Sequence, residues 1–419
     1  MTMHVDTKLL HGGYAPEETT GATALPVFQS TSFAYESAEE LEAVFAGRDA
    51  GFVYSRINNP TLDRFERRMT VLEDGLASVS CASGMAAIST TVLALAGAGD
   101  EILSGNSIFG GTYSLFAHTL ARYGITTRFV ETTDVDAYRQ AINDKTKLIF
   151  VETIGNPKLD VPDIAAIAGV AKEHGIVLAV DNTVTTPVLC RPKALGADIV
   201  IHSTSKYING HGNAIGGVIV DCGTFDWRSP RYAHLKSFYE RVRHFAFAAS
   251  LRNRVHRDLG CCFSPFNAFL MSIGMESLAV RMERHCSNAR RVAELLVADK
   301  RVAQARYPGL RGHADYEIAD RQFAGRYGAL LTFRLGTKER CFRFINALQR
   351  AQNLANLGDA KTLVIHPAST FCRDATEKEC RAMGVSDDLV RFSIGIEHVD
   401  DILEDIEQAL SKMEKGESR

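Results

Sequence analysis

Hydrophobic and polar residues follow two alternating patterns between about residue 78 and residue 221. Short apolar runs of strand length are separated by longer segments in which apolar residues recur at helical spacing. The strand-like runs are EILSG, TTRFVE, KLIFVET, IVLAVDN, DIVIHS and GGVIVD, at 101–105, 126–131, 147–153, 176–182, 198–203 and 216–221. Helical spacing occurs at 84–97, 112–124, 134–144 and 161–175. This alternation predicts an α/β fold with a mostly parallel sheet covered by helices on both faces.

The two ends of the chain have different patterns. Residues 1–60 show little periodicity and are rich in Gly, Thr, Ser and Pro, which predicts an arm that packs on something else and forms no core of its own. From about residue 256 a long helical segment (277–299) is followed by strand-like runs at 328–336 and 389–397. We therefore expect three parts: an N-terminal arm (1–60), a large α/β domain (61–255) and a smaller α+β C-terminal domain (256–419).

Composition narrows the class of protein. The hydrophobic fraction of 46% and the charged fraction of 23% are typical of soluble globular proteins. The net charge of −3 provides no basic surface for nucleic acid or membranes. The chain has no apolar run of about 18 residues and its first residues do not resemble a secretory signal, so we expect a cytoplasmic protein. The nine cysteines are scattered without a CxxC pair, which predicts reduced thiols and no metal site.

Chemically active residues follow three of the predicted strands, and ligands bind at the carboxyl ends of strands in open parallel sheets. Glu152 lies at the end of the run 147–153 and Asn156 just after it, Asp181 lies at the end of the run 176–182, and the run 198–203 ends at Ser203 and is followed by Ser205 and Lys206. In addition, Ser83-Gly84-Met85 begins a helix at the end of the run SVSCAS (78–83). Free N–H groups and the helix dipole make such a helix start an anion site.

These parts are the ones that pyridoxal phosphate needs: a lysine for the Schiff base, an acid beside the pyridine nitrogen, and a helix N-terminus with hydroxyls for the phosphate. Asp181 precedes Lys206 by 206 − 181 = 25 residues, one crossover unit, so adjacent strands can bring both to one site. Each residue alone has a plainer interpretation, as a solvated lysine, a turn aspartate or backbone-capping serines. The glycines of GHGNAIGG (210–217) lack dinucleotide-binding spacing. The co-occurrence at successive strand ends favours the cofactor.

The chain resembles, along nearly its whole length, the pyridoxal-phosphate enzymes of cysteine and methionine metabolism, the cystathionine γ-synthase/methionine γ-lyase superfamily. The matching segments are VYSRINNPT (53–61), ASGMAA (82–87), FVETIGNP (150–157), DNTVTTP (181–187), HSTSKYINGHG (202–212) and VRFSIGIE (390–397). The resemblance implies the aspartate-aminotransferase-like fold, known as fold type I. It also implies a homotetramer built as a dimer of dimers, with active sites shared between subunits.

The resemblance assigns roles to individual residues. Lys206 is implied to form the Schiff base and Asp181 to pair with the pyridine nitrogen. The other cofactor-binding residues implied are Ser83, Gly84, Met85, Phe109, Asn156, Thr183, Ser203 and Ser205, with Tyr54 and Arg56 reaching the phosphate of a neighbouring subunit. Arg391 is implied to clamp the α-carboxylate of the substrate, a bidentate role suited to guanidinium, with Asn356 beside it.

Two positions depart from the pattern of the family. Its usual Tyr-Gly dipeptide, which stacks on the cofactor, is Phe109-Gly110 here, and Gly111 stands where methionine γ-lyases carry a cysteine. The segments GGTYSLF, GTFDW and RDLGCCFSPFNAFL are most similar to those of O-acetylhomoserine sulfhydrylases. This likeness implies an enzyme of methionine biosynthesis that replaces the ester group of O-acetylhomoserine with sulfide or a small thiol, giving homocysteine.

Other activities remain open at this point. Methionine γ-lyase, cystathionine γ-lyase and cystathionine γ-synthase share the same cofactor machinery, and acetyl, succinyl and phospho esters of homoserine all fit it. A non-catalytic sulfur-transfer scaffold is the alternative of a different class. The presence of Lys206, Asp181 and Arg391 disfavours that scaffold.

Overall fold

The computed structural model describes residues 3–17, 19–373 and 375–415. Its large domain is built on a seven-stranded sheet of order β1-β7-β6-β5-β4-β2-β3. The strands are β1 (Ala77–Cys81), β2 (Glu101–Gly105), β3 (Thr126–Val130), β4 (Thr146–Glu152), β5 (Val177–Asp181), β6 (Ile199–His202) and β7 (Gly217–Asp221). Strands β2 to β6 pair in parallel, whereas β7 is antiparallel to both β1 and β6. The predicted mostly parallel sheet is confirmed.

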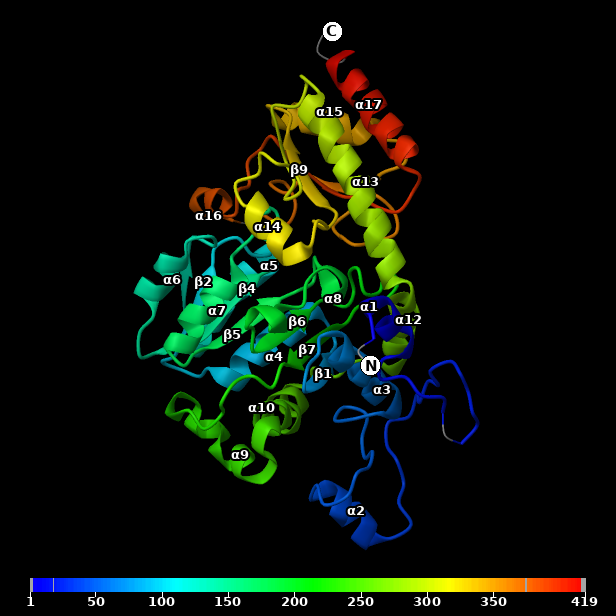
Figure 1. Cartoon of the computed structure of the whole chain (residues 1–419), viewed down its shortest axis with the longest axis vertical. Coiled ribbons are helices and arrows are strands. Elements are labelled where there is room, and N and C mark those ends of the chain that lie inside the picture. The colour runs from blue at the N-terminus through cyan, green and yellow to red at the C-terminus, as the bar shows by residue number, and fades with distance from the viewer. Residues whose placement is uncertain (1–2, 18, 374, 416–419) are drawn as a thin grey trace.

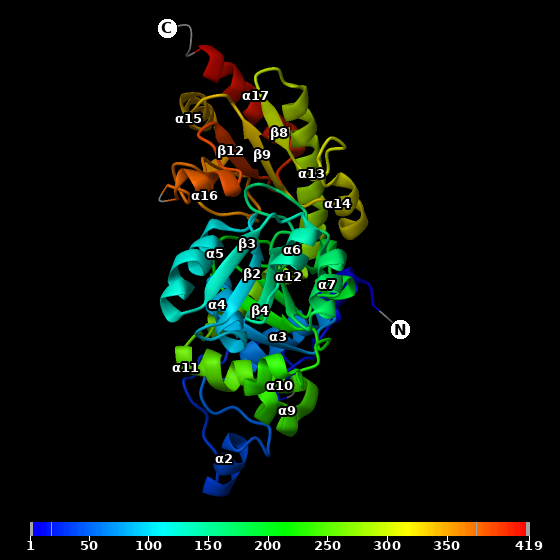
Figure 2. The same cartoon turned by 90° about the vertical axis from the view of Figure 1, so that its left-hand side faces the viewer.

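Both faces of this sheet are buried, because successive residues of a strand point to opposite sides. Leu148 and Phe150 of β4 join one apolar cluster with residues of α4 (Gly84–Leu95), while Ile149 and Val151 join another with residues of α6 (Val135–Ala141) and α7 (Ile164–Glu173). Figure 2 shows α4 and α5 (Gly110–Ser114) on one side of the strands and α6 and α7 on the other.

Side-chain caps set the helix starts that position the site. The Ser83 side chain accepts a hydrogen bond from the backbone N–H of Ala86 at the start of α4, and Asp163 caps α7 in the same way. The segment predicted as one helix at 112–124 is not continuous α-helix. It runs from α5 into a π turn (Leu115–Thr119) and a 3₁₀ turn (Leu120–Tyr123), and ends at Gly124 with φ of 77°.

The small domain is built on a five-stranded sheet of order β10-β11-β12-β9-β8. Its strands are β8 (Gln304–Arg306), β9 (Leu330–Arg334), β10 (Gln352–Asn353), β11 (Leu363–Ile365) and β12 (Leu389–Ser393). Its helices are α14 (Tyr316–Phe323), α15 (Lys338–Ala347), α16 (Glu377–Ala382) and α17 (Val399–Lys415). In Figure 1 the long helix α13 (Leu278–Ala298) rises from α12 (Pro265–Glu276) beside the large domain to α15 and α17 at the top. Because α12 packs against α3 (Pro60–Leu72) of the large domain, the boundary near residue 256 stays a prediction.

The first part of the chain contains two short helices, α1 (Val5–His11) and α2 (Ala38–Phe45). Helix α1 packs on the body through the buried Leu9, but α2 lies far from the body at the bottom of Figure 1. Among the described residues between Leu9 and Leu62, no apolar side chain is buried. Further helices lie at α8 (Thr186–Leu189), α9 (Lys236–Val242), α10 (Ala246–Ser250) and α11 (Arg257–Leu259). No helix in the described part of the chain is long and apolar enough to cross a membrane.

Candidate active site

A cavity of about 860 Å³ lies at the carboxyl ends of β4, β5 and β6, and the small domain completes its wall. Twelve of the fourteen residues predicted from the sequence line it: Ser83, Gly84, Met85, Phe109, Asn156, Asp181, Thr183, Ser203, Ser205, Lys206, Asn356 and Arg391. Tyr54 and Arg56 do not line the cavity of their own chain. The strand ends therefore converge as the sheet order requires.

The register of the sheet places the acids. Glu152 on β4 is the direct neighbour of Asp181 on β5, and Asp181 is the neighbour of Ile201 on β6. Thr183 ties the last two strand ends together: its N–H donates to Asp181 Oδ1 (2.9 Å), and its Oγ1 accepts from the Ser203 N–H (2.8 Å).

The two carboxyls are deeply buried, and burial raises the pKa of both Glu152 and Asp181. The nearby Asp181 raises the pKa of Glu152 further, whereas the hydrogen bonds from Thr183 oppose the rise at Asp181. Glu152 Oε1 also accepts from the backbone N–H of Phe109 (2.7 Å) and so holds the loop that carries the ring. Sequence analysis placed Glu152 at a strand end but gave it no role; strand register was the missing information.

Lys206 Nζ donates a hydrogen bond to Asn356 Oδ1 at 2.6 Å. Burial, followed by the like charge of Arg391, lowers the pKa of Lys206 to about 8. A lysine in this state keeps a substantial neutral fraction near neutral pH, and only the neutral amine can act as a nucleophile or base.

Arg391 is buried in the part of the wall that the small domain supplies, and burial lowers its pKa to about 10. Its Nη1 donates to Asn156 Oδ1 (3.1 Å) and its Nη2 to the backbone carbonyl of Asn356 (2.9 Å). Its Nε has no hydrogen-bond partner among the described residues. The ring of Phe371 lies 5.2 Å from the guanidinium carbon. Phe371 escaped sequence analysis because it lies in a loop without periodicity between β11 and α16.

The N-terminus of α4 forms the third wall. A side chain at Gly84 would collide with Ser203, because an added Cβ would lie 2.6 Å from the Cβ of that serine. The first N–H groups of the helix have no acceptor within the helix and face this wall as an anion site. Ser205 is fixed by Gly216, whose N–H donates to Ser205 Oγ (2.9 Å) and whose carbonyl accepts from it (3.1 Å).

Phe109 extends from the start of α5 and is more than one-third exposed. Its ring lies over Gly111, where an added Cβ would be 2.5 Å from Phe109 Cε1. A cysteine at this position would therefore displace the ring. The two departures from the family pattern are linked in space.

Tyr54 and Arg56 lie together on the arm. The guanidinium carbon of Arg56 is 5.4 Å from the centre of the Tyr54 ring, and Arg56 Nη1 donates to the carbonyl of Arg257 (2.6 Å). Tyr54 is substantially exposed. Neither the cavity nor any other part of the described chain contains a group of three or more His, Cys, Asp or Glu side chains arranged to hold a metal ion.

Comparisons with known proteins place this geometry in context. The model of the family described as Cys/Met metabolism PLP-dependent enzyme matches residues 6–411. An O-acetyl-L-homoserine sulfhydrylase of Leptospira meyeri is 41% identical over 97% of both chains, and a homocysteine synthase of Schizosaccharomyces pombe is 42% identical over 97% of this chain and 98% of its own.

One similar solved structure is a putative O-acetylhomoserine (thiol)-lyase of Campylobacter jejuni that contains N'-pyridoxyl-lysine-5'-monophosphate. It has a TM-score of 0.93 and 35% identity, covering 98% of this chain and 100% of its own. A cystathionine gamma-lyase of Lactobacillus plantarum, complexed with L-serine, has a TM-score of 0.88 and 32% identity over 98% of this chain and 100% of its own.

Proposed function

Since the chain belongs to the family of Cys/Met metabolism PLP-dependent enzymes, we propose that it replaces the ester group of O-acetylhomoserine with sulfide, giving homocysteine for methionine synthesis. The observation that carries the proposal is one cavity in which Lys206, with a pKa of about 8, faces the buried Arg391. The first residue suits covalent attachment of the cofactor and the second suits an amino-acid carboxylate.

The walls fit pyridoxal phosphate. The N-terminus of α4, Ser203 and Ser205 would hold the phosphate, and the absence of a side chain at Gly84 lets the helix start pack closely against Ser203. Asp181 would hold the pyridine nitrogen protonated, and that positive charge would offset the burial that raises the pKa of this carboxyl. When bound, the cofactor supplies an electron sink for bond breaking at the substrate.

The remaining residues bind the substrate and move its protons. Arg391 would bind the α-carboxylate with its fork oriented by Asn156 and Asn356. Lys206 Nζ would take the proton from the substrate Cα and return a proton when the product forms. The hydrogen bond from Lys206 to Asn356, which also contacts Arg391, places the base Lys206 on the same side of the cavity as Arg391.

The lining favours an ester as substrate and a small thiol as partner. Phe109 has no hydroxyl with which to protonate a leaving thiolate, whereas a carboxylate leaves without such help. Among the described residues that line the cavity, Lys206 and Arg391 are the two basic side chains. Because Lys206 is proposed to hold the cofactor, Arg391 remains to pair with the single carboxylate of O-acetylhomoserine. An incoming cysteine would bring a second carboxylate. These features disfavour methionine γ-lyase and the cystathionine γ-synthase and γ-lyase reactions.

The test is a panel of four substrates. The purified enzyme receives O-acetylhomoserine, O-succinylhomoserine, cystathionine or methionine, each with and without sulfide, and the products are identified. We expect homocysteine from O-acetylhomoserine with sulfide as the fastest reaction. Faster release of a keto acid from methionine or cystathionine without sulfide would replace this proposal with a lyase.

We further propose a cytoplasmic homotetramer, a dimer of dimers in which Tyr54 and Arg56 complete the phosphate site of a neighbouring subunit. The exposed arm and the placement of both residues outside their own cavity support this arrangement, and all nine cysteines are free thiols, as in a reducing compartment. Mixing Arg56→Ala subunits with Lys206→Ala subunits should restore part of the activity, because hybrid dimers contain one intact site. Inactive mixtures with proven subunit exchange would refute the shared site.

A further inference from the structure

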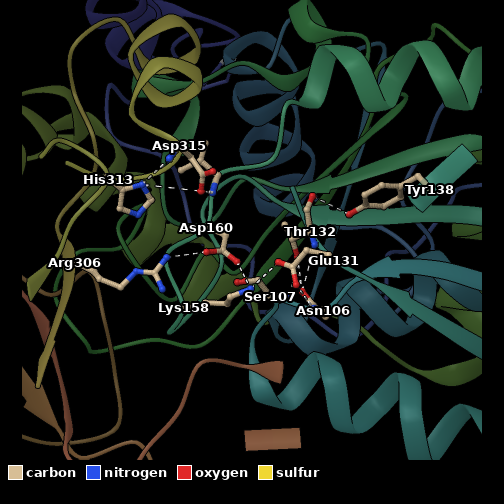
Figure 3. A network of polar contacts seen from close by, with 11 residues as sticks. Asn106, Ser107, Glu131, Thr132, Tyr138, Lys158, Asp160, Arg306, His313 and Asp315 are labelled. Atoms are coloured by element: carbon tan, nitrogen blue, oxygen red, sulfur yellow. Dashed lines mark hydrogen bonds and ion pairs between the residues drawn. The ribbon is translucent and has the colours of Figure 1, made fainter. Parts of the chain in front are cut away.

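A network of polar contacts joins the large and small domains beside the cavity (Figure 3). Asp160 lies after β4, and its Oδ1 accepts a hydrogen bond from Arg306 Nη2 on β8 (3.0 Å). Lys158 Nζ lies 2.7 Å from Asp160 Oδ2 and 2.6 Å from Glu131 Oε1. The Asp160 side chain is only 6% exposed. A charge buried this deeply is costly unless it is paired, so its partners determine where it can lie.

Arg306 and Arg391 occupy the same row of the small sheet. Arg306 on β8 pairs with Thr332 on β9, and Thr332 pairs with Arg391 on β12. Neighbouring strands are about 4.8 Å apart, so the two arginine backbones are separated by about 10 Å. Because the three strands are hydrogen-bonded to one another, a shift of this row moves both arginines together.

One short segment of the large domain contacts both arginines. Asn156 Oδ1 accepts from Arg391, and Asp160 accepts from Arg306. The segment is closed on itself, because the N–H of Gly155 donates to the carbonyl of Asp160 (3.0 Å) and the N–H of Leu159 donates to the carbonyl of Gly155 (2.9 Å). The 155–160 turn thus presents two hydrogen-bond acceptors, four residues apart, to two arginine donors on one row of the small sheet.

We infer that Asp160 and Arg306 are positioning residues for Arg391. Their ion pair fixes the small sheet against the 155–160 turn in the register at which Arg391 meets Asn156. The inference rests on the proposed function, in which Arg391 binds the substrate carboxylate. The pair touches no reacting atom, so its contribution is to the orientation of the carboxylate clamp.

Arg306→Gln is the first test variant, because Lys158 still neutralises Asp160 after the change. We expect the KM for O-acetylhomoserine to rise about fivefold to tenfold, as for the net loss of one ordinary hydrogen bond, with kcat within about twofold. Asp160→Asn is the second variant and should change KM in the same direction. Lys158 keeps Glu131 as a partner in that protein. An unchanged KM in both folded variants would overturn the inference.

Two further variants distinguish a role in positioning Arg391 from a role in merely holding the two domains together. Arg321→Gln removes another Arg–Asp pair between the domains, with Asp163, away from the row that carries Arg391, and should leave KM unchanged. Combining Arg306→Gln with Arg391→Lys should raise KM by no more than about twofold over Arg391→Lys alone, because residues that act through one group are not additive. If the KM increases of the two single variants multiply fully in the double variant, the inference is contradicted.

Binding measurements distinguish a failure of the positioning inference from a failure of the proposed function. Titration with O-acetylhomoserine without sulfide, followed by the absorbance of the cofactor, should show weaker binding in Arg391→Lys and in Arg306→Gln. If Arg391→Lys binds as the unaltered enzyme does, the proposed clamp itself is wrong. If only Arg306→Gln is unaffected, the positioning pair alone is refuted. In the cofactor-free protein, amide hydrogen exchange over 155–161 should be faster in Arg306→Gln than in Arg321→Gln, and equal rates would also refute the pair.

Discussion

The cavity has two walls built on different principles. The wall proposed to hold the cofactor, called the cofactor wall below, consists of strand ends and a helix start within one sheet layer; it is formed by Gly84, Asp181, Thr183, Ser203, Ser205 and Lys206. The wall proposed to bind the substrate, called the substrate wall below, comes from loops and a strand of the small domain; it is formed by Asn356, Phe371 and Arg391. The first wall is fixed by the pairing of adjacent strands. The second reaches its place only when the small domain is docked, through contacts such as that of Arg391 with Asn156.

This difference separates the two roles of the site. The groups proposed to hold the cofactor through every turnover lie on a rigid, buried sheet. The groups proposed to bind and release the substrate lie on the part of the molecule that can be adjusted through a domain contact. Changes to the cofactor wall should therefore abolish chemistry, and changes to the substrate wall should mainly weaken substrate binding.

The largest effect is expected from Lys206→Ala on the cofactor wall. Loss of the amine should lower homocysteine formation by about 10⁴-fold or more, because both covalent attachment and proton transfer depend on it. Circular dichroism should show an unchanged fold. Lys172→Ala, which alters an exposed lysine on α7, is the matched control and should keep full activity. Near-normal turnover by the Lys206 variant would remove the residue from its proposed role.

The pH dependence of cofactor uptake probes how the two walls are coupled. Only neutral Lys206 can attack the aldehyde of pyridoxal phosphate, and its pKa is lowered from 10.5 to about 8. The uptake rate of the cofactor-free protein should rise about 50-fold between about pH 6 and pH 8 and level off above about pH 9. Arg391→Gln should move the midpoint to higher pH, because it removes a nearby positive charge. A rate that keeps rising beyond about pH 10 would indicate an ordinary, solvated lysine.

The same contrast explains how much could be predicted from the sequence. Asp181 and Lys206 each follow an apolar strand, so periodicity and the rule for strand ends located them without a structure. Glu152 had the same signal, but its role as neighbour of Asp181 depends on strand register. The antiparallel direction of β7 could have been recognised, because residues 203–216 contain no helix for a parallel crossover. Phe371 carried no signal, since it reaches the site only through domain docking.

A smaller effect is expected on the substrate wall from Arg391→Lys. The charge remains but the planar fork is lost, so kcat/KM for O-acetylhomoserine should fall about 10-fold or more, equivalent to about 1.4 kcal/mol or more. The affinity for pyridoxal phosphate should not change, because Arg391 is not part of the cofactor wall. Steady-state kinetics and a cofactor titration check the two halves of this expectation. Weaker cofactor binding with unchanged kcat/KM would reverse the assignment of the walls.

The smallest and most selective effect is expected at Phe109, which lines the cavity at the start of α5. A tyrosine there keeps the ring and adds a hydroxyl that can donate a proton. A departing carboxylate needs little help, because its conjugate acid has a pKa of about 4, whereas a thiol titrates near about 8.5. Phe109→Tyr should therefore raise γ-elimination from methionine by about threefold to tenfold and leave elimination from O-acetylhomoserine within about twofold.

The outcome also depends on the room around the ring. Gly111 lies directly beneath Phe109 Cε1, so the ring can keep its place only while residue 111 has no side chain. Adding Gly111→Cys to Phe109→Tyr should displace the ring and reduce the gain on methionine. Efficient methionine cleavage by the unaltered enzyme would mean that another group protonates the leaving thiolate. The argument for an ester substrate from Phe109 would then fail, and the proposed sulfhydrylation would need support from the substrate panel alone.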